Sequence, residues 1–384
     1  MFRSMPFILL MLILSVICLD SFIPISLKQI LYSISLSVKS SIIFILPIII
    51  FCLLFNAMVN LANSATKIIG LILILVCCSN FVTTFLSHYV GIWVYNFDLS
   101  MMEPKESSGL EPLWSFNLPS IIANNHAMFF AIIMGLLFSK IYKDGALKAS
   151  VYLDKFLNFI FKILVYIIPV FVIGFIVKLQ HDAVILTIIK DYSVIFIVVA
   201  LTQVSYIAII FLLLNDIKIK DWFNSIKNML PAAIIGFSTM SSAASMPMTI
   251  IGVEKNAKNK AVASSVVPAT VNIHLIGDCI AIPVFAYAVL KSFGMPEPSL
   301  FSYMIFAFYF VLAKFSVAAI PGGGIIVMLP ILEKHLGFNA DMMSIITALY
   351  ILFDPVITCT NILGNGAFAK LTEKSVAFIN RERK

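Results

Sequence analysis

Charged residues are scarce in this chain. Of its 384 residues only 12% are Asp, Glu, Lys or Arg, whereas 61% are hydrophobic. About a quarter of a soluble domain is charged, so this scarcity excludes a soluble fold for most of the chain. Apolar runs of about 20 residues, long enough to span a bilayer as a helix, recur from end to end. We therefore predict an all-α polytopic membrane protein that forms a single transmembrane unit over residues 1–384.

Signals for disulfides, metal sites and a cleavable leader are also lacking. The six cysteines lie in apolar segments and show no metal-ligand spacing, so we expect neither a disulfide nor a metal site. The apolar run at 5–20 ends without the small residues of a cleavage site, and we expect it to remain as the first span. Because no nucleophile–base set or metal cluster converges, the sequence disfavours an enzyme.

The distribution of charge predicts the orientation in the membrane. Residues 98–125 are acidic, whereas 140–155 are rich in lysine. Because positively charged loops face the cytoplasm, 98–125 should lie outside and 140–155 inside, with both termini cytoplasmic. The same rule explains the net charge of +7 without nucleic-acid binding. The predicted spans are residues 5–20, 31–62, 68–95, 126–141, 156–178, 192–214, 261–290 and 341–371.

Two further apolar segments are interrupted by small residues, proline and glycine. The first has arms at 228–235 and up to Val253, which are too short to cross the bilayer. The second has arms at 300–317 and 325–336. Non-helical backbone at membrane depth must be buried in protein or line a cavity, and paired interruptions are typical of transporter binding sites. The alternative is that each break only kinks a packed helix. The predicted re-entrant helical hairpins cover about 228–256 and 300–337.

A polar stripe lies near the end of the chain. Asp354, Thr358, Asn361 and Asn365 are spaced four, three and four residues apart, so a helix would place them on one face. Polar groups at membrane depth are costly unless they face protein, water or a ligand. The stripe is therefore a candidate binding surface.

Four motifs in the second half of the chain resemble those of one transporter family. S-S-A-A-S-M-P at 241–247 and P-G-G-G at 321–324 resemble the tips of its two hairpins. P-A-T-V-N at 268–272 resembles the approach to its N-M-D-G-T motif in helix seven. N-I-L-G-N at 361–365, followed by A-K-L-T-E, resembles its N-x-x-G-D and A-K-T-E in helix eight. The family is that of the glutamate/neutral amino acid transporters, or dicarboxylate/amino acid:cation symporters, and the resemblance is strongest over 228–374.

This resemblance implies a homotrimer in which each chain has eight transmembrane helices, two re-entrant hairpins and an elevator-type mechanism. A scaffold at 1–65 and 126–190 would hold a moving transport part at 66–96 and 192–375. The substrate would lie between the hairpin tips and helices seven and eight.

Carried over residue by residue, the resemblance implies that Asp354 binds the amino group of the substrate, with Thr358 and Asn361 beside it. A carboxylate there makes a charge-assisted hydrogen bond to an ammonium. The alternative is that Asp354 is a structural residue paired to a neighbouring helix. The other implied substrate-binding residues, all at the hairpin tips, are Thr239, Ser241, Ser242, Pro321, Gly322 and Gly324.

The departures from the family pattern concern the substrate and the coupling ion. The arginine that grips an acidic side chain falls on Ile357, which argues against glutamate or aspartate and for a neutral or apolar amino acid or a similar solute. Two aspartates of the cation sites fall on His274 and Asn365, which are poorer sodium ligands. The candidate residues for cation binding or coupling are Asn272, His274, Asp278, Lys314, Asn361 and Asn365.

Three of these candidates leave alternatives open. Asp278 follows His274 by four residues, so a helix would place both on one face, where Asp278 could pair with His274 or serve a cation. Lys314 either places its ammonium where a cation would bind or snorkels to the outer surface. His274 either titrates and couples transport to protons or is a neutral, hydrogen-bonded histidine of the core.

The sequence thus predicts a secondary active transporter, a symporter, that moves a small amino acid or carboxylate across the inner membrane with sodium or a proton. The expected partners are the substrate, the coupling cation and the lipid bilayer, with no nucleic acid; sodium is the only expected cofactor. The alternative is a degenerate family member that binds solute or conducts ions without coupled transport.

Overall fold

The structure is a computed structural model that describes most of the chain. The described residues are Met11, 15–16, 18–63, 67–97, 109–116, 118–119, Ile122, 124–182, 185–315, 317 and 322–381. The predicted first span at 5–20 lies largely outside these residues. Pro321, at the predicted tip of the second hairpin, also lies outside them.

Every regular element in the described part of the chain is a helix, as predicted. The helices are η1 (Asp20–Phe22), α2 (Ile25–Asn63), α3 (Lys67–Tyr95), α4 (Asn124–Ile141), α5 (Lys143–His181), α6 (Ile185–Leu214), α7 (Ile219–Thr239), α8 (Ser242–Asn256), α9 (Lys260–Thr270), α10 (Ile276–Ser292), α11 (Leu300–Lys314), α12 (Gly323–Leu336) and α13 (Ala340–Arg381).

Several of these helices suit a membrane. Within the described residues, Gly70–Tyr95, Tyr192–Leu214 and Asp341–Ile379 are long and apolar enough to cross one, by length and composition alone. Leu300–Lys314 and Phe129–Ile141 are apolar but shorter. The total of eight spans and the re-entrant course of the hairpins remain predictions.

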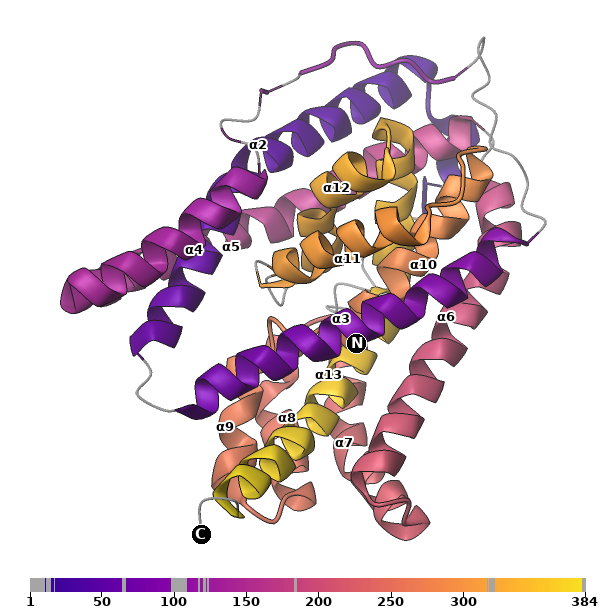
Figure 1. Ribbon diagram of the computed structural model, residues 1–384. Helices are drawn as coiled ribbons and strands as arrows, with labels where there is room; N and C mark the ends of the chain where they lie inside the picture. The colour runs from indigo at the N-terminus through magenta and orange to yellow at the C-terminus, as the bar shows by residue number, and fades with distance from the viewer. Residues whose placement is uncertain are drawn as a thin grey trace.

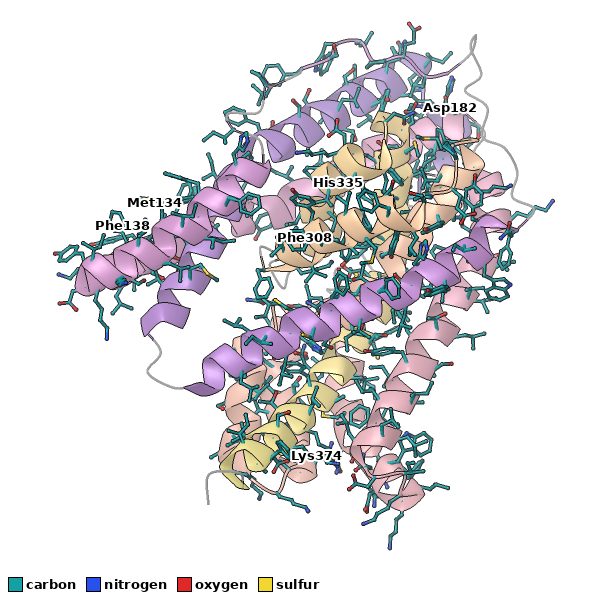
Figure 2. The ribbon with its side chains drawn as sticks, viewed as in Figure 1. Met134, Phe138, Asp182, Phe308, His335 and Lys374 are labelled. Atoms are coloured by element: carbon teal, nitrogen blue, oxygen red, sulfur yellow. The ribbon has the colours of Figure 1, made fainter. Side chains whose placement is uncertain are left out.

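The helices pack in two groups. The first consists of α2, α4 and α5, which pack on one another. The second is built around α13, which contacts α6, α7, α8, α9, α10 and α12, while α3 packs along α10 and α11. In Figure 1, α10, α11 and α12 lie above the diagonal of α3, and α7, α8 and α9 lie below it. Figure 2 places His335 of α12 above α3 and Lys374 of α13 below it. α13 contacts helices on both sides of α3, namely α10 and α12 above it and α7, α8 and α9 below it.

The first predicted hairpin is a pair of packed helices, α7 and α8, joined at Met240 and Ser241. Met240 has a left-handed backbone with φ 51°, and the Ser241 side chain caps α8 by accepting a 3.2 Å hydrogen bond from the Ala244 amide. The predicted extent of the first arm, residues 228–235, is wrong, because α7 begins at Ile219 and continues through Gly236 to Thr239. A Cβ at Gly236 would lie 2.0 Å from the Ile362 side chain, so glycine serves close packing on α13 and does not end the helix.

The second predicted hairpin is the pair α11 and α12, which also pack on one another. Its arms end and begin near the predicted positions, at Lys314 and Gly323. Gly322 precedes α12 with φ 72°, a conformation that costs glycine nothing.

The predicted span at 261–290 is not one continuous helix. It divides into α9 and α10 at an irregular stretch, residues 271–275. Asn80 of α3 replaces the missing helical partners there: its Nδ2 donates to the Ile273 carbonyl at 2.7 Å, and its Oδ1 accepts from the Leu275 amide at 3.3 Å. Irregular backbone within a membrane protein needs such partners, since lipid supplies none.

The approach of α2 and α5 depends on a glycine. A Cβ at Gly174 of α5 would lie 2.1 Å from the Leu31 carbonyl oxygen of α2, whereas a Cβ at Gly70 of α3 would have no atom within 4 Å. We therefore expect Gly174→Ala to destabilise the protein by about 1–3 kcal/mol through overpacking. Gly70→Ala is the matched control. Thermal unfolding of the detergent-solubilised chain measures both variants, and equal unfolding temperatures would contradict the contact.

Candidate substrate and cation site

The polar stripe predicted near the end of the chain lies on α13 and is buried. Asp354, Thr358, Asn361 and Asn365 are each no more than 4% exposed. The helix is unbroken along them, so their spacing places them on one face, as predicted. Neighbouring helices supply hydrogen-bond partners to this face, and these partners define the site.

Asp354 joins α13 to the second hairpin. Its Oδ2 accepts a 2.9 Å hydrogen bond from the Gly322 amide, and its Oδ1 accepts a 3.0 Å hydrogen bond from the Thr358 hydroxyl. The carboxylate therefore lies at the N-terminal end of α12, where the helix dipole favours negative charge. Within the described residues, Asp354 forms no ion pair with a lysine, arginine or histidine.

The first hairpin contacts the same face of α13. A Cβ on Gly236 would lie 3.3 Å from Thr358 Cγ2, so α7 passes close to the residue that bonds Asp354. The predicted tip residues make local bonds: Thr239 Oγ1 accepts from the Ser241 amide at 3.2 Å, and the Ser242 carbonyl accepts from the Ser245 hydroxyl at 2.9 Å. The tip is thus an ordered helix start, and the α7 residue that approaches Thr358 is Gly236, shortly before it.

Asp278 on α10 is the centre of a second buried cluster. Its Oδ1 lies 3.3 Å from Lys314 Nζ and accepts a 2.9 Å hydrogen bond from the Tyr350 hydroxyl. Its Oδ2 accepts a 2.7 Å hydrogen bond from Asn361 Nδ2. The Lys314 side chain is 0% exposed, so the expectation that it snorkels to the outer surface is wrong; a buried carboxylate attracts its ammonium instead. Gly324 makes room for the cluster, since a Cβ there would lie 2.0 Å from Asp278 Oδ1.

Asn361 and Asn365 connect α13 to the interrupted helix α9–α10. Asn361 Oδ1 accepts a 2.8 Å hydrogen bond from the Gly277 amide at the start of α10. Asn365 Oδ1 accepts from the Thr270 hydroxyl at 2.9 Å, and its Nδ2 donates to the Asn361 carbonyl at 3.0 Å and the His274 carbonyl at 3.3 Å. Both asparagines therefore hold the irregular backbone in place.

His274 lies in that irregular stretch and not on a helix. The expected pairing with Asp278 is therefore wrong, because helical spacing does not apply there, and Asp278 pairs with Lys314. The His274 ring lies 4.2 Å from the Phe368 ring, centre to centre, with the two planes tilted by 36°, and its Nε2 lies 2.8 Å from the Ser79 hydroxyl. Its Nδ1 has no hydrogen-bond partner among the described groups. The Asn272 side chain is exposed and so belongs to neither of the buried clusters.

Two contributing residues were not predicted. Tyr350 bonds Asp278, and it precedes Asp354 by four residues, so the spacing of the stripe could have revealed it. Gln203 of α6 donates a 2.9 Å hydrogen bond to the Gly277 carbonyl and accepts one of 3.0 Å from Thr360. Its signal was a lone amide inside an apolar span.

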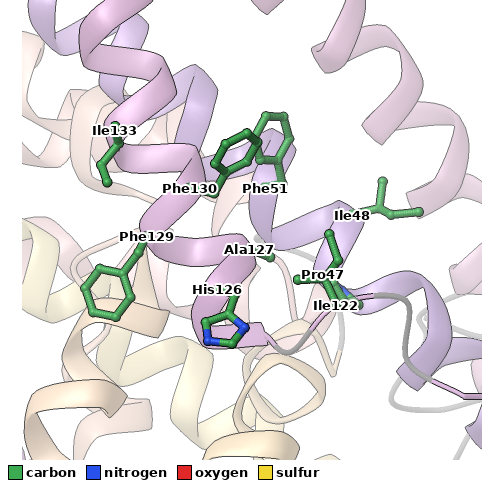
Figure 3. Close-up of a pocket in the computed structure, with 9 residues that line it drawn as sticks. All are labelled: Pro47, Ile48, Phe51, Ile122, His126, Ala127, Phe129, Phe130 and Ile133. Atoms are coloured by element: carbon green, nitrogen blue, oxygen red, sulfur yellow. The ribbon is translucent and has the colours of Figure 1, made fainter.

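An apolar cavity of about 630 Å³ lies elsewhere, between α2 and α4. Figure 3 shows its lining, which is apolar apart from His126. No residue of the α13 stripe contributes to it, and it offers no set of polar groups that would orient a polar solute.

Helix pairs that meet at turns, an interrupted helix and a buried polar face of α13 together define a membrane protein with a transporter-like site. A model of the sodium:dicarboxylate symporter family matches residues 5–375, so the chain belongs to this family. The resemblance predicted from the motifs is confirmed. The family is one of cation-coupled transporters, not of enzymes. A search of curated proteins gave no match.

The contact at Gly324 gives a test of the Asp278 cluster. We expect Gly324→Ala to destabilise the chain by about 1–3 kcal/mol, because the added methyl group overlaps the carboxylate and the Tyr350 hydroxyl. Gly109→Ala is the control, since its Cβ would lie 3.9 Å from the nearest atom. If thermal unfolding does not separate the two variants, α12 does not pack on Asp278 as described.

Proposed function

We propose that the chain is a symporter that moves a small, neutral amino acid, or a similar small carboxylate, across the inner membrane together with sodium or a proton. The observation that carries the proposal is Asp354, a buried carboxylate without a cationic partner among the described residues. A buried charge is costly unless it is paired. The ammonium group of an amino acid supplies that missing partner.

The surroundings of Asp354 support a zwitterionic ligand. Each carboxylate oxygen accepts one hydrogen bond from the described residues and retains a lone pair for an ammonium donor. Both α8 and α12 contact α13, and the N-terminal end of α12 lies at Asp354. Helix N-terminal ends favour anions, so the start of α12 would suit the carboxylate of the same ligand. Ile357 is fully buried and offers no guanidinium to a second carboxylate. These features favour a neutral side chain over an acidic one.

The proposal extends to the rest of the assembly. The group α2, α4 and α5 would serve as scaffold, and the group around α13 as the moving part, in a homotrimer with cytoplasmic termini. Among the described helices, most contacts lie within one group or the other, and the few that join them are α2 with α12 and α5 with α6, which supports this division. The candidates for cation coupling include Asn272, His274, Asn361 and Asn365, all on or beside the irregular stretch that α13 holds.

A second candidate function is solute binding or ion conduction without coupling. The Lys314–Asp278 pair favours it, because an ammonium already neutralises one of the carboxylates that a mobile cation would use. Uptake of a labelled amino acid panel into proteoliposomes, with imposed sodium or proton gradients, distinguishes the two. Symport requires accumulation that depends on a gradient. A folded protein that accumulates no member of the panel would contradict it.

Asp354→Asn tests the amino-group contact directly. The substitution keeps the shape and removes the charge, so the amino acid that the panel identifies should bind about 10- to 100-fold more weakly, as expected for a lost charged hydrogen bond. Asp341→Asn, the same change at a side chain 56% exposed on the same helix, is the control. Unchanged affinity in Asp354→Asn would remove Asp354 from the substrate site.

The coupling ion is tested at His274. If His274 couples transport to protons, uptake should depend on a pH gradient, be the same with and without a sodium gradient, and be lost in His274→Ala. His126→Ala, at an exposed histidine of the distant cavity, should leave uptake unchanged. Uptake that follows sodium and survives His274→Ala would instead assign the coupling to sodium.

A further inference from the structure

Lys314 and Asp278 form a buried ion pair that the proposed binding of the substrate at Asp354 does not use. Lys314 ends α11, and Asp278 lies in the first turn of α10; their side chains are 0% and 2% exposed. An ionised carboxylate at such depth requires a counter-charge, and removing one partner of a buried pair leaves the other uncompensated. Lys314 is therefore the reason that Asp278 can be buried as a carboxylate.

The ammonium is held as a point charge. Its Nζ lies 3.3 Å from Asp278 Oδ1 and 4.5 Å from the centre of the Phe310 ring, yet it makes no hydrogen bond with the described part of the chain. An ammonium has three donors to direct. Here the contacts are Coulombic and cation–π, and neither depends on donor direction. A monovalent metal ion could replace the ammonium without loss of a directed bond.

Oxygen ligands for such an ion are already in place. The Asp278 carboxylate supplies the charge, and the Tyr350 hydroxyl oxygen lies 2.9 Å from Asp278 Oδ1. Hard monovalent cations prefer such oxygen donors. The carboxylate is also fixed from its other side by Asn361, so it would remain oriented if the ammonium were removed.

We propose that Asp278 is a latent site for a monovalent alkali cation, which the ammonium of Lys314 fills as a tethered cation. In the natural chain the ammonium and a mobile ion compete for one carboxylate, and the tethered group excludes the ion. Removal of the ammonium alone opens the site; removal of both charges abolishes it. The inference concerns ion binding and can be tested without any transport.

The test is thermal unfolding of the full chain in detergent, followed by tryptophan fluorescence, in NaCl and in choline chloride at equal ionic strength. An ion that binds only the folded state raises the unfolding temperature. In Lys314→Met, sodium should raise it by several degrees more than in the unsubstituted chain. The excess should disappear in the double variant Asp278→Asn/Lys314→Met. Lys178→Met, which removes the lysine of the less buried pair Lys178–Asp182, should show no such excess.

The proposal is overturned if sodium and choline act on Lys314→Met as they do on the unsubstituted chain. It is also overturned if Lys314→Met cannot be recovered folded in either salt while the double variant can, because Asp278 would then accept no mobile ion. Recovery of Lys314→Met in sodium but not in choline supports it. None of these outcomes depends on the substrate, so failure of the proposed symport leaves the test intact.

Discussion

The burial of polar groups on α13 is the constraint on which the arrangement of its neighbours depends. An amide, hydroxyl or carboxylate inside an apolar core is costly unless it is hydrogen-bonded. α13 carries such groups over several turns, and three of them find partners on three other elements: Asp354 at the start of α12, Asn361 at the start of α10, and Asn365 at the end of α9. The stripe therefore fixes the positions of three helix ends relative to one helix.

The same constraint explains why irregular backbone can exist at this depth. Residues 271–275 do not form a continuous helix, and Asn80 of α3 and Asn365 of α13 bond to the Ile273 and His274 carbonyls and the Leu275 amide. Gln203 of α6 adds a hydrogen bond to the Gly277 carbonyl in the first turn of α10. Amide side chains are suited to this task because each supplies both donors and an acceptor. The helix ends around the site are thus held by side chains from three directions.

Much of this arrangement could be predicted from the sequence, and each wrong prediction has a physical reason. The stripe on α13 followed from spacing alone, and the family followed from short motifs at the breaks. Spacing failed where the backbone is not helical, as at His274, and composition failed at Gly236, where glycine serves close packing within a helix. Whether the Lys314 side chain is buried or exposed depends on which residue of another helix faces it, and no local sequence pattern contains that information.

The two buried carboxylates differ in how their charge is balanced. Asp278 and Lys314 together contribute no net charge, whereas Asp354, when ionised, contributes one negative charge that no described cation balances. Moving one elementary charge across a membrane costs about 2.3 kcal/mol per 100 mV of opposing potential. On the proposed function, a zwitterionic amino acid satisfies Asp354 locally but adds no net charge, so the loaded site would remain negative. One sodium ion or proton makes it neutral. On the proposed function, one coupling cation per substrate would therefore be enough to neutralise the loaded site, because the lysine already balances the second carboxylate.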